Sequence, residues 1–121
     1  MKKKYRIKKN TEIQELMKKK TTVGNSYFVL YYKKNHDNEN FRYAVSVPKK
    51  FGKAFERNLM KRRIREIVKT NNFDKQSEFF LITKLKSKDL TFSEIKDKVE
   101  ELFKRAKLLE ERIKWKQKTK Y

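Results

Sequence analysis

Cysteine is absent from this sequence of 121 residues, and glycine, proline and histidine occur only two, one and one times. Without cysteine there can be no disulfide and no cysteine-ligated zinc site. Two glycines and one histidine provide no glycine-rich phosphate loop, no nucleophile elbow and no histidine pair. The carboxylates are scattered among lysines, so no acidic cluster for a metal-dependent nuclease is evident. We therefore expect no catalytic residues and no metal ligands in the protein itself, and a solvated loop position for His36.

Long apolar runs are missing as well. No run approaches the roughly 18 residues that a membrane-spanning helix needs, and the basic start, Met1 to Arg6, lacks the apolar region of a signal peptide. The lack of cysteine fits a reducing compartment. We expect a soluble cytoplasmic protein with no membrane partner.

Positive charge is what the sequence has in excess. It contains 35 Lys and Arg against 15 Asp and Glu, for a net charge of +20. Such a chain repels itself unless an anion neutralises it, which points to nucleic acid or an anionic membrane as partner. Aromatic residues make up 13% of the chain and its apolar residues form periodic blocks, so we expect a packed domain rather than disorder.

The segment from Arg57 to Lys69 is predicted to be a helix with two distinct faces. An apolar seam recurs at helical spacing and is formed by Met60, Ile64, Ile67 and Val68. Four cations recur every four residues, namely Arg57, Lys61, Arg65 and Lys69. Asn58 and Arg62 lie alongside that row. Like charges at this spacing destabilise an isolated helix, so the row favours an external polyanion.

The other elements are predicted from capping boxes, apolar periodicity and strand-like alternation. We expect a short helix from Asn10 or Thr11, strands at 27–32 and 41–47, the central helix to Thr70, a strand at 78–84, and a helix from Thr91 to Leu109 or Ile113. The first two strands are predicted to pair as an antiparallel hairpin. The whole chain, 1–121, is expected to be one α+β domain, a small two-layer sandwich with a basic arm at 1–9 and a basic tail at 114–121. The strands on either side of the central helix would be joined by a crossover, which is usually right-handed.

Two surfaces are candidates for binding. Lys49, Lys50 and Lys53 precede the cationic row and extend it, which favours nucleic-acid contact over an ordinary solvated helix face. Asn58 would bond either RNA or the backbone of its own helix. The second surface is a groove between the first helix and the aromatic strand, lined by Ile13, Met17, Tyr27, Val29 and Tyr31. Unstacked bases rest on such surfaces, although the spacing alone favours ordinary core.

One motif makes the chain resemble a known family. It runs Lys49-Lys50-x-Gly52-x-Ala54-x-x-Arg57-Asn58-x-x-Lys61-Arg62-x-x-Arg65-Glu66. This is similar to the signature of the protein subunit of bacterial ribonuclease P. Tyr5 to Asn10 resembles that family's N-terminal segment, and Phe28 to Tyr31 resembles its first long strand.

The resemblance implies a fold like the second domain of ribosomal protein S5, with a left-handed crossover at the central helix in place of the right-handed one expected above. It also implies a function. The protein would join a catalytic RNA, and the holoenzyme, an endoribonuclease, would remove the 5′ leader of precursor tRNA with Mg²⁺ held mainly by RNA and substrate. No stable protein partner is expected. The alternative is a structural RNA-binding protein of the ribosomal type.

The resemblance also assigns roles to residues. It implies that the catalytic RNA is bound by Arg57, Asn58, Lys61, Arg62 and Arg65, and from their charge we expect Lys49, Lys50 and Lys53 to bind its phosphates as well. The single-stranded leader would lie in the groove, where the resemblance implicates Ile13, Met17 and Tyr31 and the strand pattern adds Val29. Family members often have aromatic residues where this chain has Ile13 and Met17, so we expect apolar contact there and aromatic contact from Tyr31.

Overall fold

The computed structural model describes residues 5–7, 10–18 and 21–109. Its helices are α1 (Asn10–Lys18), α2 (Ala54–Lys69) and α3 (Phe92–Arg105), with short 3-10 helices η2 (Lys49–Phe51) and η3 (Leu85–Asp89). Its strands are β1 (Thr22–Gly24), β2 (Phe28–Lys34), β3 (Arg42–Ser46) and β4 (Ser77–Thr83). The mixed α+β class predicted from the sequence is confirmed. None of the helices in the described ranges combines the length and apolar character needed to cross a bilayer.

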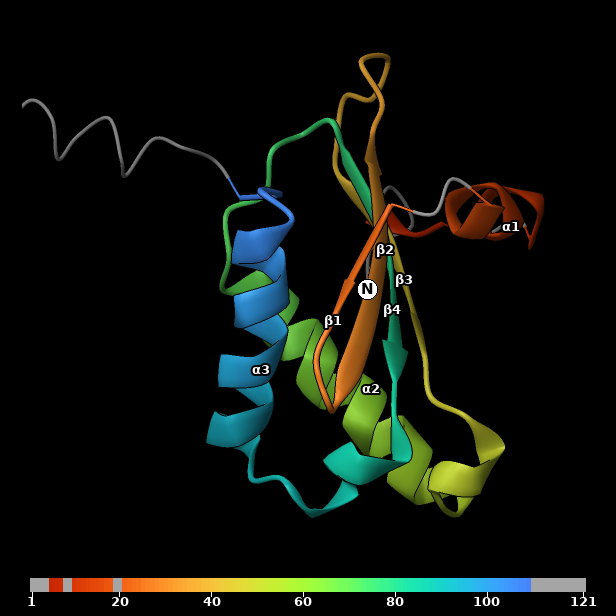
Figure 1. Ribbon diagram of the computed structural model, residues 1–121, viewed down its shortest axis with the longest axis vertical. Coiled ribbons are helices and arrows are strands. Elements are labelled where there is room, and N and C mark those ends of the chain that lie inside the picture. The colour runs from red at the N-terminus through yellow and green to blue at the C-terminus, as the bar shows by residue number, and fades with distance from the viewer. Residues whose placement is uncertain (1–4, 8–9, 19–20, 110–121) are drawn as a thin grey trace, which may run out of the picture.

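The four strands form a sheet in the order β1-β2-β4-β3 (Figure 1). β4 runs antiparallel to β2 and parallel to β3, and α2 lies in the connection between β3 and β4. The predicted hairpin of 27–32 with 41–47 is therefore wrong, because β4 separates the two strands. β4 is apolar on both faces, as suits a central strand covered on both sides.

The hairpin that does form joins β1 to β2, and β1 was not predicted. The turn between them is closed by the Asn25 side chain, whose Oδ1 accepts the N–H groups of Tyr27 and Phe28 at 2.9 Å each. Strand pairing begins only at Phe28, and Tyr27 packs on the main core beside α3, under Lys98. The expectation that Tyr27 shares the groove face with Val29 and Tyr31 is wrong for this reason.

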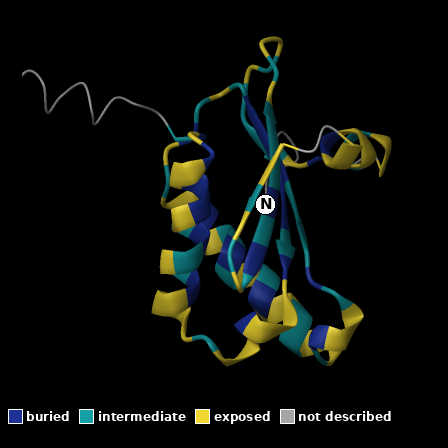
Figure 2. Cartoon of the chain, viewed as in Figure 1, coloured by how far each residue is buried: buried dark blue, intermediate teal, exposed yellow. Residues whose placement is uncertain are grey.

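Helices cover both faces of the sheet. α2 and α3 lie on one face and α1 on the other, so a partial third layer adds to the predicted two-layer sandwich (Figure 1). Alternate residues of β4 serve the two sides. Phe79 and Leu81 belong to the main core under α2 and α3, and Phe80 belongs to a smaller cluster under α1. Figure 2 shows the buried positions of α2 and α3 turned towards the sheet.

α3 is shorter than predicted. It ends at Arg105 rather than running to Leu109, and Ile113 lies outside the described residues. Lys107 adopts a left-handed backbone with φ of 56°, and the Leu108 N–H donates to the Phe103 carbonyl at 3.2 Å. This is a Schellman termination, with Leu108 and Phe103 both fully buried beside it.

The N-terminal segment is attached to the open edge of β3. The Ile7 N–H donates to the Tyr43 carbonyl at 3.0 Å, and the Ile7 side chain is buried. Tyr5 stacks on Phe41 with ring centroids 4.7 Å apart. Three residues of the predicted basic arm thus belong to the fold, while 1–4 and 8–9, like the tail at 114–121, lie outside the described residues.

Candidate nucleic-acid interface

α2 is held on the sheet by the apolar seam predicted from the sequence. Its four members are nearly or fully buried, with exposed fractions of 3% for Met60, 0% for Ile64, 1% for Ile67 and 2% for Val68. This anchoring fixes which side of the helix faces outward. The cationic row and its neighbours therefore project from a rigid element rather than from a loop.

The start of α2 depends on a close approach at Gly52. The Lys53 N–H donates to Oε1 of Glu56 at 2.9 Å, and this hydrogen bond is the main reason that the pKa of Glu56 is lowered. A Cβ at Gly52 would lie 2.5 Å from the same Oε1 atom. The absence of a side chain at Gly52 thus lets the Glu56 carboxylate cap the helix, and it places Lys53 directly beside the first turn.

The predicted RNA-binding cations lack partners of their own. We call basic face the group formed by Lys49, Lys50, Lys53, Arg57, Lys61, Arg62 and Arg65. Within the part of the chain that the structure describes, none of the seven charged side-chain groups lies within 4.0 Å of a carboxylate oxygen. Lys49, Lys50, Lys53 and Arg62 are exposed, and the other three are half-buried. Unpaired cations on one rigid helix and its approach segment are suited to bind an external polyanion.

Asn58 projects outward beside this face. Its side chain is exposed and makes no hydrogen bond to the helix backbone, so the capping role considered for it is not seen among the described residues. It lines a shallow hollow of about 370 Å³ with Phe55, Leu59 and Arg62. Its amide is therefore available to a ligand.

Where the groove was predicted, α1 packs on the sheet through a small apolar cluster, and the groove as a leader-binding site stays a prediction. Leu16 of α1 is fully buried against Ile7 and Phe80, and Ile13, Tyr31 and Ala44 pack around this cluster. Val29 pairs with Ile82, which packs on the same cluster, and this places Val29 on the same face. Met17, which was also predicted for the groove, is 41% exposed and does not belong to this cluster.

Residues of the groove and residues of the basic face line one hollow of about 310 Å³. Ile13, Ala44 and Phe80 line it from the groove, and Lys61 and Arg65 line it from α2. Neither Phe80 nor Ala44 was among the predicted groove residues. The signal for Phe80 was present, since Phe79 and Phe80 are adjacent in a strand and must face opposite sides of the sheet. Ile13 and Arg65 line the same hollow only because of the tertiary structure, and no local sequence pattern predicts this.

The side chains of the interface are mainly cationic or apolar. Among the residues described by the structure, no group of three or more His, Asp or Glu side chains is placed to hold a metal ion. His36 is exposed in the loop after β2, as predicted. The groups that do converge here can bind phosphate oxygens and the faces of bases.

Known proteins resemble this chain over most of its length. The Ribonuclease P family model matches residues 1–107 of the chain. The ribonuclease P protein component of Phytoplasma australiense is 44% identical over 98 residues, covering 79% of this chain and 85% of that protein. That of Macrococcus caseolyticus is 41% identical over 114 residues, covering 93% and 99%. The structure of Staphylococcus aureus RNase P protein matches with a TM-score of 0.79 and 37% identity, covering 88% of this chain and 98% of that one. The chain therefore belongs to the ribonuclease P protein family.

Proposed function

We propose that this chain is the RNA-binding subunit of a ribonuclease P holoenzyme. It joins the catalytic RNA and binds the 5′ leader of precursor tRNA, so that endonucleolytic cleavage yields the mature tRNA 5′ end. The observation that carries the proposal is the shared hollow, where Lys61 and Arg65 stand opposite Ile13 and Phe80. One side of that hollow suits phosphate and the other suits bases.

The basic face is assigned to the catalytic RNA. The guanidinium groups of Arg57, Arg62 and Arg65 can each form two parallel hydrogen bonds to a phosphate, while the lysines act as point charges. Because these cations have no internal carboxylate partners among the described residues, binding an RNA breaks no ion pair. Asn58 adds a neutral amide that can bond a phosphate, a sugar hydroxyl or a base edge.

The groove is assigned to the leader. Tyr31 and Phe80 offer aromatic surface, and Ile13 and Val29 offer apolar surface, on which unstacked bases can rest without sequence-specific hydrogen bonds. The leader would pass beside Lys61 and Arg65. The substrate strand and the catalytic RNA would therefore be held next to each other by the same helix.

Magnesium belongs to this proposal as an ion held mainly by RNA and substrate. The shared hollow presents cationic groups, which suit phosphate oxygens, and apolar groups, which suit bases. Mg²⁺ prefers oxygen ligands, which RNA phosphates supply. The protein's contribution is to neutralise phosphate charge and to position the two RNAs. We assign no bond-making step to a side chain.

We also infer the finer fold, that of the second domain of ribosomal protein S5 with a left-handed β3–α2–β4 crossover. The parallel pairing of β3 with β4 across α2 supports a crossover at this point. A structural RNA-binding protein of the ribosomal type would share these features. Cleavage activity separates the two functions.

The test is a cleavage assay at low magnesium. Precursor tRNA is incubated with ribonuclease P RNA alone, with this chain alone, and with both. We expect the chain to stimulate cleavage by the RNA at the mature 5′ end and to cleave nothing by itself. No stimulation, or cleavage by the chain without RNA, would overturn the proposal. Tyr31→Ala, compared on precursors with and without a leader, tests the groove separately, because only the precursor with a leader should lose affinity.

A further inference from the structure

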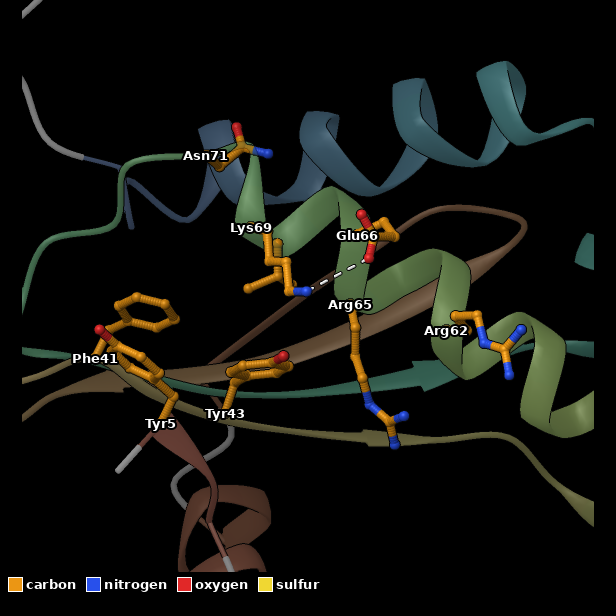
Figure 3. Close-up of a pocket in the computed structure, with 9 residues that line it drawn as sticks. Tyr5, Phe41, Tyr43, Arg62, Arg65, Glu66, Lys69 and Asn71 are labelled. Carbon is orange, nitrogen blue, oxygen red and sulfur yellow. Dashed lines mark ion pairs between the residues drawn. The ribbon is translucent and has the colours of Figure 1, made fainter. Parts of the chain in front are cut away.

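A second and larger hollow, which we call the side pocket, lies on the other side of Arg65. It has a volume of about 540 Å³ and opens between the second half of α2 and the start of β3 (Figure 3). Tyr43 and Arg65 line both this pocket and the hollow beside the groove, so they separate the two. None of the residues predicted for the leader groove lines the side pocket.

One wall of the side pocket is aromatic. Tyr5 and Phe41 stack with centroids 4.7 Å apart and planes at 24°, and Phe41 and Tyr43 are 6.1 Å apart with planes at 23°. Phe73 and Phe79 support this wall from the core, at 4.9 Å from Phe41 and 5.3 Å from Tyr43. The rings are thus held in place before any ligand arrives. Tyr43 is only 3% exposed, so the part of the wall that is open to a base belongs mainly to the half-buried Tyr5 and Phe41.

The opposite wall is charged and comes from α2. Arg62, Arg65 and Lys69 line it, and Figure 3 shows these side chains on the helix that faces the rings. Only Lys69 has an ion-pair partner among the described residues, Glu66 at 3.5 Å, and both side chains are more than half exposed. Such an exposed pair contributes little, so Lys69 can turn to a phosphate at small cost.

We propose that the side pocket binds one unstacked nucleotide of an RNA, with its base against the aromatic wall and its phosphate on Arg62, Arg65 and Lys69. The volume falls within the roughly 300–1,000 Å³ of pockets that enclose small organic ligands. Aromatic surface facing several cations matches a nucleotide, which has a flat base and an anionic phosphate. An acidic peptide would use the cations and leave the aromatic wall unused.

Glu66 gives the pocket a preference among bases. Once Lys69 has turned to the phosphate, the Glu66 carboxylate is left at the pocket wall as a hydrogen-bond acceptor. Adenine, cytosine and guanine each present an amino group that can donate to a carboxylate. Uracil has no amino group, and carbonyl oxygens flank its only ring N–H on both sides. We therefore expect uridine to bind least well.

This inference rests on the proposed function for the identity of the RNA, since the nucleotide would come from the catalytic RNA or from the precursor tRNA. It adds a contact that the groove and the basic face do not provide. An inserted nucleotide fixes the register of the RNA on α2, whereas phosphate contacts alone carry no sequence information.

Ultraviolet crosslinking of the unmodified chain tests the proposal. The chain is irradiated with ribonuclease P RNA, with and without precursor tRNA, and crosslinked peptides and reverse-transcription stops are mapped. We expect adducts on the peptides that contain Tyr5, Phe41 or Tyr43, joined to one nucleotide that is not uridine. An adduct formed without precursor assigns that nucleotide to the catalytic RNA, and one that requires precursor assigns it to the substrate. Normal cleavage activity without adducts on these peptides would overturn the inference while leaving the proposed function intact.

A binding measurement on the free chain gives an independent check. Ring signals of Phe41 and Tyr43 are followed by NMR during titration with AMP, CMP, GMP and UMP, and with inorganic phosphate. The first three should shift these signals saturably and UMP more weakly, with Glu66→Ala removing the difference. Phe41→Leu keeps apolar volume but not the ring, and it should weaken mononucleotide binding about tenfold, a factor within the range of base stacking. Equal shifts with phosphate alone, or no shift with any nucleotide, would contradict the proposal.

Discussion

Two groups of basic side chains on this fold differ in what neutralises them. Lys33 and Arg42 lie at one end of the sheet around the buried carboxylate of Glu78, at 3.6 and 3.9 Å, and Arg42 also pairs with Glu12 at 2.8 Å. Asn38 donates a hydrogen bond of 2.7 Å to Glu78. The basic face of α2 has no such carboxylates among the described residues. The first group is satisfied within the protein, and the second is left for a ligand.

The difference shows that charge count alone does not identify a binding surface. The paired group has a structural task, because Arg42 joins α1 to the sheet through Glu12 and so holds one wall of the groove. The unpaired group lies on α2, which is already anchored by its apolar seam, and on the segment that leads into this helix. Removing a charge should therefore cost stability in the first group and RNA binding in the second.

The largest effect is expected for Glu78→Ala. The Glu78 side chain is only 4% exposed, and its loss leaves the partly buried Lys33 without a carboxylate and Arg42 with Glu12 alone. We expect the free energy of unfolding to fall by about 3 kcal/mol, measured by urea denaturation. Glu66→Ala is the matched control, since its pair with Lys69 is exposed, and it should cost less than about 0.5 kcal/mol. Equal costs would remove the distinction between the two groups.

The next effect concerns the unpaired group. Arg65→Ala should weaken binding to ribonuclease P RNA by about 10- to 100-fold, as expected for loss of a charged hydrogen bond. Its free energy of unfolding should change by less than about 0.5 kcal/mol. Arg57→Ala should behave in the same way.

Two variants of the same helix serve as controls for that prediction. Arg63 lies about 160° around the helix from Arg65, at roughly 100° per residue, and Arg63→Ala should leave RNA affinity nearly unchanged. Ile64 is fully buried, and Ile64→Ala should lower the free energy of unfolding by about 2–5 kcal/mol. Similar losses of melting temperature in Arg65→Ala and Ile64→Ala would mean that the basic face stabilises the fold rather than binding RNA.

A smaller effect should follow when α1 is released from the sheet. Arg42→Gln removes the ion pair with Glu12 and with it one constraint on the groove wall. Affinity for precursor tRNA should fall about fivefold, the equivalent of one partly exposed ion pair. A precursor without a leader, measured in parallel, should bind as before. A loss shared by both substrates would place the effect outside the groove.

The smallest effect is a pH dependence from an exposed helix cap. The Thr91 N–H donates to Glu94 at 2.9 Å, and this hydrogen bond is the first cause of the lowered pKa of Glu94. Because the pKa is lower in the folded state, the stabilisation is complete above the ordinary glutamate value of about 4.3 and is lost as the pH falls through the folded value. As the pH is lowered into the acid range, the melting temperature should therefore fall less for Glu94→Gln than for the original chain. Identical acid profiles would contradict the capping role.

Local patterns in the sequence predicted the helices and the apolar seam of α2 well. Met60 and Ile64 recur at helical spacing, and that periodicity reports burial directly. The end of α3 was missed because it depends on the left-handed conformation of Lys107, a residue without the usual turn signal. The three-residue strand β1 was also missed, since it is too short to show alternation.

Long-range pairing explains the remaining differences. The insertion of β4 between β2 and β3 is decided by contacts such as Leu30 with Leu81, which are distant in sequence. The residues of the basic face all lie between Lys49 and Arg65, so the local sequence is sufficient to predict them. The meeting of Ile13 with Arg65, and the side pocket with Tyr5 and Phe41, arise only when the N-terminal segment and α1 take their places against the sheet.

The salt dependence of RNA binding tests the central claim most directly. If the basic face neutralises about six phosphates, log affinity for ribonuclease P RNA should fall with log salt with a slope of roughly −4 to −5. Arg65→Ala should make that slope shallower by about 0.7–0.9, the contribution of one phosphate, and Arg63→Ala should leave it unchanged. A slope near zero, or the same slope for Arg65→Ala as for the original chain, would contradict the assignment of the unpaired cations to RNA.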